Sequence, residues 1–247
     1  MINLIIDANE LLMKSIFVWR KNKKIPFQYF LLRQIIKYIK EFKASRIFIA
    51  ADGGHSWRKY IYPEYKANRK DLREKIEDVD WNYVFKSYNF LLKNLDKYTI
   101  AKVIQIDNIE ADDIISYLSR YLSYVYQEDV IIVSQDSDIR QLARTPRVKV
   151  YSTRRKKFID KDNVMNIIKN KMIKGDTSDN IPKAESFGEK VRNFILVNLI
   201  KLPDPVEEVI RNKVEEVLSS ETKVDREKFT KAYKYKFLQD DSYLFQS

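Results

Sequence analysis

Aspartates that follow runs of apolar residues constrain this chain more than any other feature of its sequence. Three runs have the length and β-branched content of buried strands, and an aspartate closely follows each of them. The runs are residues 3–6 before Asp7, residues 47–51 before Asp52, and residues 130–134 before Asp136 and Asp138. Parallel strands place their carboxyl ends at one edge of a sheet. These carboxylates are therefore expected to meet there and to form a metal site.

Further acidic residues lie at two predicted helix starts. One group precedes an apolar stripe at helical spacing, Ile114 to Val125, and the other follows Gly175. The complete set of nine is Asp7, Asp52, Glu110, Asp112, Asp113, Asp136, Asp138, Asp176 and Asp179. Each group also has a structural interpretation, as a helix cap or as a partner of the helix dipole. Capping alone does not explain why acidic residues gather at the strand ends. Carboxylates that lie so close to one another need a cation to compensate their charge.

The pattern of the whole chain predicts an α/β fold with a mostly parallel central sheet and helices on both faces. Strand candidates alternate with segments long enough to hold helices, near residues 2–6, 46–51, 102–106, 129–134 and 147–151. From about residue 161 the strand signals stop, and the rest is expected to form short helices broken near Gly175, Pro182, Pro203 and Pro205. This predicts an α/β core over residues 1–160 and a helical region over residues 161–247.

Composition narrows the chemistry of the predicted site. The chain has no cysteine, which excludes disulfides, thiolate nucleophiles and sulfur-ligated zinc. His55 is the only histidine, and it is expected to be a loop residue, so oxygen ligands favour Mg²⁺ or Mn²⁺. So many carboxylates exceed the needs of one Mg²⁺. Two ions about 4 Å apart would use them and would suit in-line displacement at phosphorus. Phosphodiester hydrolysis is the resulting hypothesis.

The net charge of +11 indicates a polyanionic partner. Basic residues cluster, partly among tyrosines, at residues 20–24, 58–75, 154–157 and 169–174. Any single cluster is also explained as a solvated helix face. Together, basic flanks around an acidic centre favour nucleic acid over a small acidic metabolite.

Six motifs in a fixed order resemble one family. They are Asp7, Asp52-Gly53, residues 65–69, residues 110–113, residues 135–138 and residues 175–182. In these motifs the chain resembles the 5′-nuclease, or flap endonuclease, family, and most closely its free-standing bacteriophage members. The resemblance runs from Asp7 to about Lys190 and implies a PIN-like nuclease core.

The resemblance implies a role for each motif residue. Asp7, Asp52, Glu110 and Asp112 correspond to ligands of a catalytic metal, with Asp113 as an outer-sphere or shared member. Asp136 corresponds to a bridging ligand, and Asp138, Asp176 and Asp179 correspond to a second-metal group. The implied cofactor is a pair of Mg²⁺ ions, for which Mn²⁺ would substitute. Lys66 and Arg69 match a basic pair that reaches the scissile phosphate. Tyr65 is a candidate for base stacking, with a packing role as the alternative.

Two further regions of the family are implied. Residues 62–95 correspond to a helical arch over the active site, and the helices between about residues 161 and 199 to a helix-three-turn-helix that holds duplex DNA. Substrate-binding candidates there are Lys183, Gly188 and Lys190. Lys183 and Ser186 stand where the family has glycine, which puts the family's bound K⁺ and its usual duplex contact in question.

The expected function is that of a structure-selective, metal-dependent 5′ nuclease in replication or repair. It would act as a 5′-3′ exonuclease and flap endonuclease on DNA with a 5′ flap or 5′ end, or on an RNA primer/DNA hybrid. The alternatives are a PIN-like ribonuclease and a catalytically silent DNA-binding replication protein. A separate polymerase or single-strand-binding protein is the expected kind of partner, and a monomer the expected state. No apolar run approaches a membrane span, so the expected location is the cytoplasm of a bacterial or phage-infected cell.

Overall fold

The computed structural model describes residues 1–160 and 164–246. Its strands are β1 (Ile2–Asp7), β2 (Arg46–Ala51), β3 (Ala101–Gln105), β4 (Asp129–Val133), β5 (Val148–Ser152) and β6 (Lys157–Phe158). Its helices are α1 (Ala8–Lys21), α2 (Phe27–Phe42), α3 (Arg58–Ile61), α4 (Asn68–Glu74), α5 (Trp81–Tyr98), α6 (Ala111–Tyr124), α7 (Val164–Lys174), α8 (Phe187–Val197), α9 (Asp204–Ser219), α10 (Arg226–Ala232) and α11 (Lys236–Asp240), with 3₁₀ turns η1 (Ile139–Arg144) and η2 (Thr177–Asp179). The boundary predicted between residues 160 and 161 adjoins residues 161–163, which lie outside the described residues.

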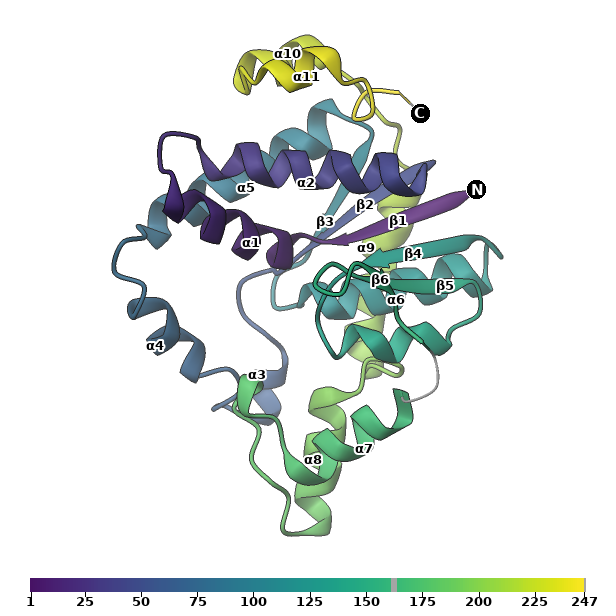
Figure 1. The fold of residues 1–247 in the computed structure, drawn as a ribbon. Helices are drawn as coiled ribbons and strands as arrows, with labels where there is room; N and C mark the ends of the chain where they lie inside the picture. The colour runs from purple at the N-terminus through teal and green to yellow at the C-terminus, as the bar shows by residue number, and fades with distance from the viewer. Residues whose placement is uncertain (161–163, 247) are drawn as a thin grey trace.

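The strands form one sheet in the order β3-β2-β1-β4-β5-β6 (Figure 1). All neighbouring pairs are parallel except β5 with β6. The chain passes from β1 to β2 and β3 on one side and returns to β4 on the other side of β1. In such sheets the point where the order reverses leaves a crevice beyond the carboxyl ends of the strands. The predicted fold class is confirmed, and the short β6 is an addition to it.

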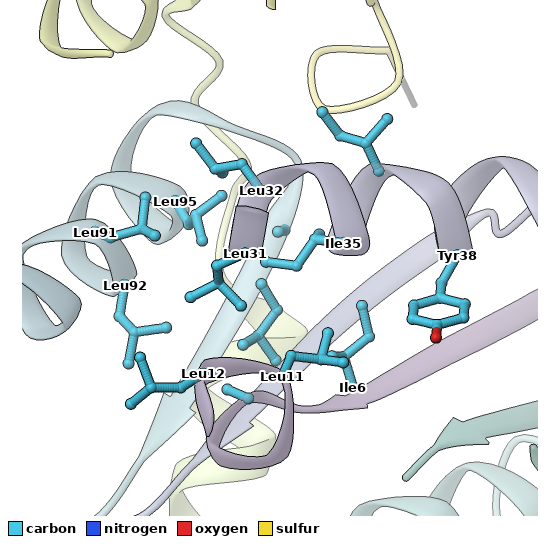
Figure 2. Packing of buried hydrophobic residues seen from close by; sticks show 14 of the residues in the cluster. Ile6, Leu11, Leu12, Leu31, Leu32, Ile35, Tyr38, Leu91, Leu92 and Leu95 are labelled. Carbon is cyan, nitrogen blue, oxygen red and sulfur yellow. The ribbon is translucent and has the colours of Figure 1, made fainter. Parts of the chain in front are cut away.

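Alternating side chains on β1 separate two hydrophobic clusters. Leu4 and Ile6 face a cluster formed with α1, α2 and α5, whereas Ile5 faces a second cluster formed with α6, α9 and η1. Figure 2 shows the first cluster, in which side chains of α2 and α5 lie above Ile6 and Leu11 of α1 lies beside it. Both faces of the sheet are therefore covered, which explains why the strands are apolar along their whole length.

The C-terminal region belongs to the same cores. Ile210 and Val214 of α9 are buried in the second cluster, while Phe229 and Leu238 are buried in the first. Helix α9 is a regular helix of 16 residues rather than one of the short, broken helices expected here. The proline at position 205 occupies its first turn, where the missing N–H costs nothing, so it starts a helix instead of ending one.

The segment predicted as an arch, residues 62–95, divides into two parts. Val84, Tyr88, Leu91 and Leu95 of α5 recur at helical spacing and are buried in the first cluster, so this half is a core helix. Only residues 62–80, which include α4, leave the body of the protein (Figure 1). The predicted arch is therefore too long at its C-terminal end. Within the described residues, no helix has both the length and the apolar character needed to cross a membrane.

Candidate active site

A cavity of ≈ 1150 Å³ lies at the carboxyl edge of the sheet. Four of the predicted acids line it: Asp7 from β1, Asp52 after β2, Asp112 from α6, and Asp136 after β4. Five basic residues line it as well, namely Lys66, Arg69, Arg140, Arg154 and Arg155. The switch in strand order thus places acids and cations from distant parts of the chain around one cavity.

Two of these acids also order the backbone around the cavity. Asp7 caps α1 by accepting a hydrogen bond from the Glu10 N–H at 3.1 Å, and its other oxygen accepts from the Ser134 hydroxyl at 2.9 Å. Asp52 accepts from the backbone N–H of Ala111, in the first turn of α6, at 2.8 Å. Asp7 therefore caps α1, and Asp52 contributes to the start of α6, which lies 59 positions further along the chain.

Burial and mutual repulsion disfavour the charges of the cavity acids. Burial, assisted by the charge of Glu10, raises the pKa of Asp7 to about 7. Burial also raises the pKa of Asp52, with Glu110 adding to the effect. For Asp112, burial and then the charges of Asp136 and Asp7 raise the pKa well above its usual value. Carboxylates in this situation are stabilised by a divalent cation, and an all-oxygen donor set fits Mg²⁺ or Mn²⁺.

A second acidic group lies in and beside η2. Carboxylate oxygens of Asp138, Asp176 and Asp179 lie within 4.8 Å of one another. The Nζ of Lys171 is 2.5 Å from oxygens of both Asp138 and Asp176. Burial, partly offset by Lys171, raises the pKa of Asp138 to about 6. In the sequence, Lys171 is one member of the basic run 169–174. Nothing in the spacing distinguishes it from its neighbours, so its contact with these carboxylates was not predicted.

Asp113 does not belong to the cavity. Its side chain is 0% exposed, and Arg58 donates to both of its oxygens, at 2.8 and 2.7 Å. Trp57 Nε1 donates to it as well, at 2.8 Å. Asp113 therefore does not line the cavity, and its role as an outer-sphere or shared ligand stays a prediction. Its partner Arg58 is 2% exposed, although the sequence placed it in a surface-like basic run.

Glu110 is held by three donors. Arg58 donates to its Oε2 at 2.8 Å, Tyr65 donates to the same oxygen at 3.1 Å, and Lys66 donates to Oε1. Burial alone would raise its pKa, but Lys66 and Arg58 outweigh burial and lower the pKa of Glu110 to about 2.

Tyr65 is 2% exposed, and its hydroxyl, which has a single proton, also lies 3.2 Å from Asp179 Oδ2, so that proton is shared between the carboxylates of Glu110 and Asp179. The packing alternative is therefore the correct one, because a buried ring cannot stack on a base.

Lys66 and Arg69 lie where the predicted arch meets the second acidic group. Lys66 Nζ is 3.9 Å from Asp179, and Arg69 donates to Asp179 at 2.8 Å. The backbone N–H of Lys66 donates to the Asp179 carbonyl at 2.9 Å, and Asn68 donates to the Thr177 carbonyl at 3.1 Å. These contacts fasten the base of the arch to η2, so both cations are held at the cavity wall.

The predicted duplex-binding residues lie elsewhere. Lys183 is exposed and pairs with Glu185 at 3.0 Å. Ser186 and Glu189 form a capping box at the start of α8, whose first turn contains Gly188 and Lys190. A Cβ on Gly188 would meet open space, so this glycine serves no close backbone contact within the described residues. All of these residues are separate from the cavity lining.

Replacing Gly53 by Ala is expected to lower the free energy of unfolding by about 1–3 kcal/mol. A Cβ at Gly53 would lie 1.7 Å from the carbonyl oxygen of Ile106, which is backbone and cannot move aside alone. Thermal unfolding measures the change. Gly188→Ala is the matched control, because its Cβ meets open space and alanine suits a helix. Equal stability of the Gly53 variant and wild type would contradict the expectation.

In buffer without divalent ions, the protein is expected to lose stability as the pH rises from about 4 to about 7. The folded state holds the Asp7 proton up to about pH 7, whereas the unfolded state releases it near its ordinary pKa of 3.8, so folding is favoured below this window and less so above it. Urea unfolding at pH 5 and pH 7.5 measures the loss, and Asp7→Asn should show a smaller one. Glu110, whose pKa falls from 4.5 to about 2, changes its contribution to stability only below about pH 4.5 and so does not affect the comparison of pH 5 with pH 7.5. An unchanged pH dependence in Asp7→Asn would refute the assignment.

The comparisons with known proteins agree with this geometry. Residues 3–169 match the family described as 5′-3′ exonuclease, N-terminal resolvase-like domain. A 5′-3′ exonuclease of Mycoplasmopsis pulmonis (strain UAB CTIP) is 30% identical over 81% of this chain and 67% of that protein. A ribonuclease H of Enterobacteria phage T4 is 33% identical over 59% of this chain and 48% of that protein. The chain thus spans about half the length of the phage T4 relative.

A solved structure of the bacteriophage T5 flap endonuclease, a pseudo-enzyme-product complex with DNA and metal ions, has the same fold. It matches with a TM-score of 0.73 and 21% identity over 88% of this chain and 98% of that one. A parallel sheet with a carboxylate-lined cavity at its switch point, faced by cations, fits the metal-dependent class of nucleases, and the matched family is one of exonucleases. The chain belongs to the 5′-3′ exonuclease family, as the six motifs predict.

Proposed function

We propose that this protein is a structure-selective 5′ nuclease that hydrolyses phosphodiesters near junctions of single-stranded and duplex DNA in replication or repair. The carrying observation is the cavity in which Asp7, Asp52, Asp112 and Asp136 meet cations from both sides. A phosphodiester with its bound metals would be neutralised there from several directions. The family relatives, which are exonucleases and flap endonucleases, support the proposal.

The proposed ligands form two groups. Asp7, Asp52 and Asp112, with Glu110 beside them, would hold one Mg²⁺, and Asp138, Asp176 and Asp179 would hold another. Asp136 would bridge the groups, since it lines the cavity and its charge acts on both Asp112 and Asp138. When bound, two such ions supply a nucleophilic hydroxide and stabilise the attacking and leaving oxygens. Mn²⁺ is expected to substitute for Mg²⁺.

The basic residues would position the substrate. Lys66 and Arg69 are paired with Glu110 and Asp179, and an entering phosphate offers them a second anion at the cavity wall. A cation there would stabilise charge that develops on the phosphate oxygens. Lys171 occupies the space between Asp138 and Asp176, so it would have to yield part of that space to an ion.

The two regions of the chain would have different tasks, although they share the same hydrophobic cores and do not form separate folding units. Residues 1–160 would carry the catalytic core with the arch of residues 62–80, and residues 161–247 would hold the duplex through Lys183, Gly188 and Lys190. We assign no K⁺ site there, because Lys183 and Ser186 replace the expected glycines and Ser186 serves as a helix cap. An RNA primer/DNA hybrid as substrate, a separate polymerase or single-strand-binding partner, and a monomeric state belong to the same proposal.

Cleavage assays on three labelled substrates test the function. Purified protein in Mg²⁺ is expected to cut a 5′-flap DNA near its junction, to degrade a blunt duplex more slowly, and to leave single-stranded RNA intact. Chelation by EDTA should abolish the cleavage. Preferential cleavage of the RNA would favour a PIN-like ribonuclease, and binding to the flap without cleavage in Mg²⁺ or Mn²⁺ would show a silent DNA-binding protein.

A further inference from the structure

The tight turn between β5 and β6 carries three consecutive cations, Arg154, Arg155 and Lys156, and Lys157 follows as the first residue of β6. Only the two arginines line the cavity, and Arg140 of η1 lines it beside them. The acidic residues of the cavity thus have basic residues on two sides. Lys66 and Arg69 come from the arch, and the three arginines come from η1 and the β5–β6 turn.

The two basic groups differ in their partners. Lys66 and Arg69 are both paired with buried carboxylates, those of Glu110 and Asp179. Across residues 1–160 and 164–246, by contrast, no carboxylate forms an ion pair with Arg140, Arg154 or Arg155. Among the described residues, an arriving anion therefore meets no carboxylate that it would have to displace from these three guanidinium groups.

The β5–β6 turn is fastened to the loop that carries Asp136. The Thr153 hydroxyl donates to Glu10 Oε1 at 2.5 Å, and Lys14 pairs with the same oxygen at 2.6 Å. The other oxygen of Glu10 accepts from the backbone N–H of Gln135, the residue before Asp136. Glu10 therefore connects the two segments, and their relative position is set before substrate binds, which lowers the ordering cost of binding.

Hydrogen bonds within the turn fix its backbone. The N–H of Arg155 donates to the Ser152 hydroxyl at 3.2 Å, and the N–H of Lys156 donates to the Ser152 carbonyl at 2.7 Å. Arg154 and Arg155 are themselves exposed, so the structure combines a fixed backbone with guanidinium groups that are open to a ligand.

We propose that Arg154 and Arg155, together with Arg140, form a subsite for a phosphodiester of the substrate strand that neighbours the cleaved one. Planar guanidinium groups bind phosphate oxygens in a bidentate manner, which suits a built subsite better than lysine would. Such a contact anchors the strand across a cavity whose own acids repel it. The inference rests on the proposed nuclease function. A 5′-terminal phosphate has the same chemistry, and the test separates the two sources.

The test couples side chains to individual phosphates. Flap DNAs that each carry one uncharged methylphosphonate linkage, at successive positions around the cleavage site, are titrated in Ca²⁺ against wild type and Arg154→Ala/Arg155→Ala. At one position the neutral linkage should weaken wild-type binding about tenfold, and the double variant should bind unmodified DNA about tenfold more weakly. The double variant with the DNA that carries this neutral linkage should bind about tenfold, not a hundredfold, more weakly than wild type with unmodified DNA, because both changes remove the same contact. Lys156→Ala/Lys157→Ala is the matched control, and its losses should multiply with those of every linkage.

The proposed subsite would be overturned if the affinity loss of the arginine variant multiplied with the loss from the neutral linkage at every position, while thermal unfolding of the variant stayed unchanged. Coupling that depends only on whether the DNA carries a 5′-phosphate or a 5′-hydroxyl would overturn the assignment to an internal phosphodiester. Binding in Ca²⁺ decides these points without any cleavage. Failure of the proposed function would be seen separately, as wild type that leaves the unmodified flap uncut in Mg²⁺.

Discussion

Replacing Asp136 by Asn is expected to reduce Mg²⁺-dependent flap cleavage by at least about a thousandfold, since a catalytic metal ion contributes several kcal/mol to the transition state. Asp136 lines the cavity, and its Oδ1 accepts a hydrogen bond from the Asp138 N–H at 2.8 Å. Asparagine keeps that acceptor and removes only the charge, so the loop should remain ordered. The loss would therefore report on metal binding and not on folding.

Single-turnover cleavage measures the rate, and flap binding in Ca²⁺ should stay within a few fold of wild type. Asp107→Asn is the matched control, because this aspartate also follows a parallel strand, β3, but is exposed and separate from the cavity lining. It should cleave at the wild-type rate. A rate for Asp136→Asn within tenfold of wild type would remove this residue from the metal site.

Replacing Arg58 by Met is expected to lower the free energy of unfolding by about 3–5 kcal/mol, the usual cost of leaving buried charges without their partner. Both Asp113 and Glu110 depend on this guanidinium, at 2.7 and 2.8 Å. Its Nε also donates to the carbonyl of Leu196 in α8, at 2.7 Å. The substitution should therefore loosen the proposed duplex-binding region together with the core.

Urea unfolding measures the stability, and a double-mutant cycle with Asp113→Leu isolates the pair. The double variant should be more stable than the sum of the two single losses predicts, because it removes both charges together. Lys70→Met is the control, since Lys70 pairs with Glu74 on the surface of α4 at 3.8 Å and should contribute under about 1 kcal/mol. A loss below about 1 kcal/mol for Arg58→Met would show that the buried pair is not required.

Asp112 and Asp113 show how much of the candidate site can be predicted from the local sequence pattern. Adjacent positions on a helix point about 100° apart, so two neighbouring carboxylates of α6 cannot both face the cavity. Asp112 lines the cavity, whereas Asp113 points into the interior toward Arg58. Helical geometry predicts that only one of them faces the cavity. Which one depends on the direction from which β1, β2 and β4 approach the helix.

The sequence by itself determined the fold class and the place of the site. Apolar runs specify strands locally, and parallel strands must deliver Asp7, Asp52 and Asp136 to a common edge. The tertiary structure decided which cations are buried partners and which face the cavity. Arg58 and Arg155 both stand in basic runs, yet one lies 2% exposed against Asp113 and the other is open to solvent. Charge and spacing within a run do not encode this difference, because the carboxylate that pairs with Arg58 is 55 positions away in the chain and meets it only after the sheet and its helices have packed.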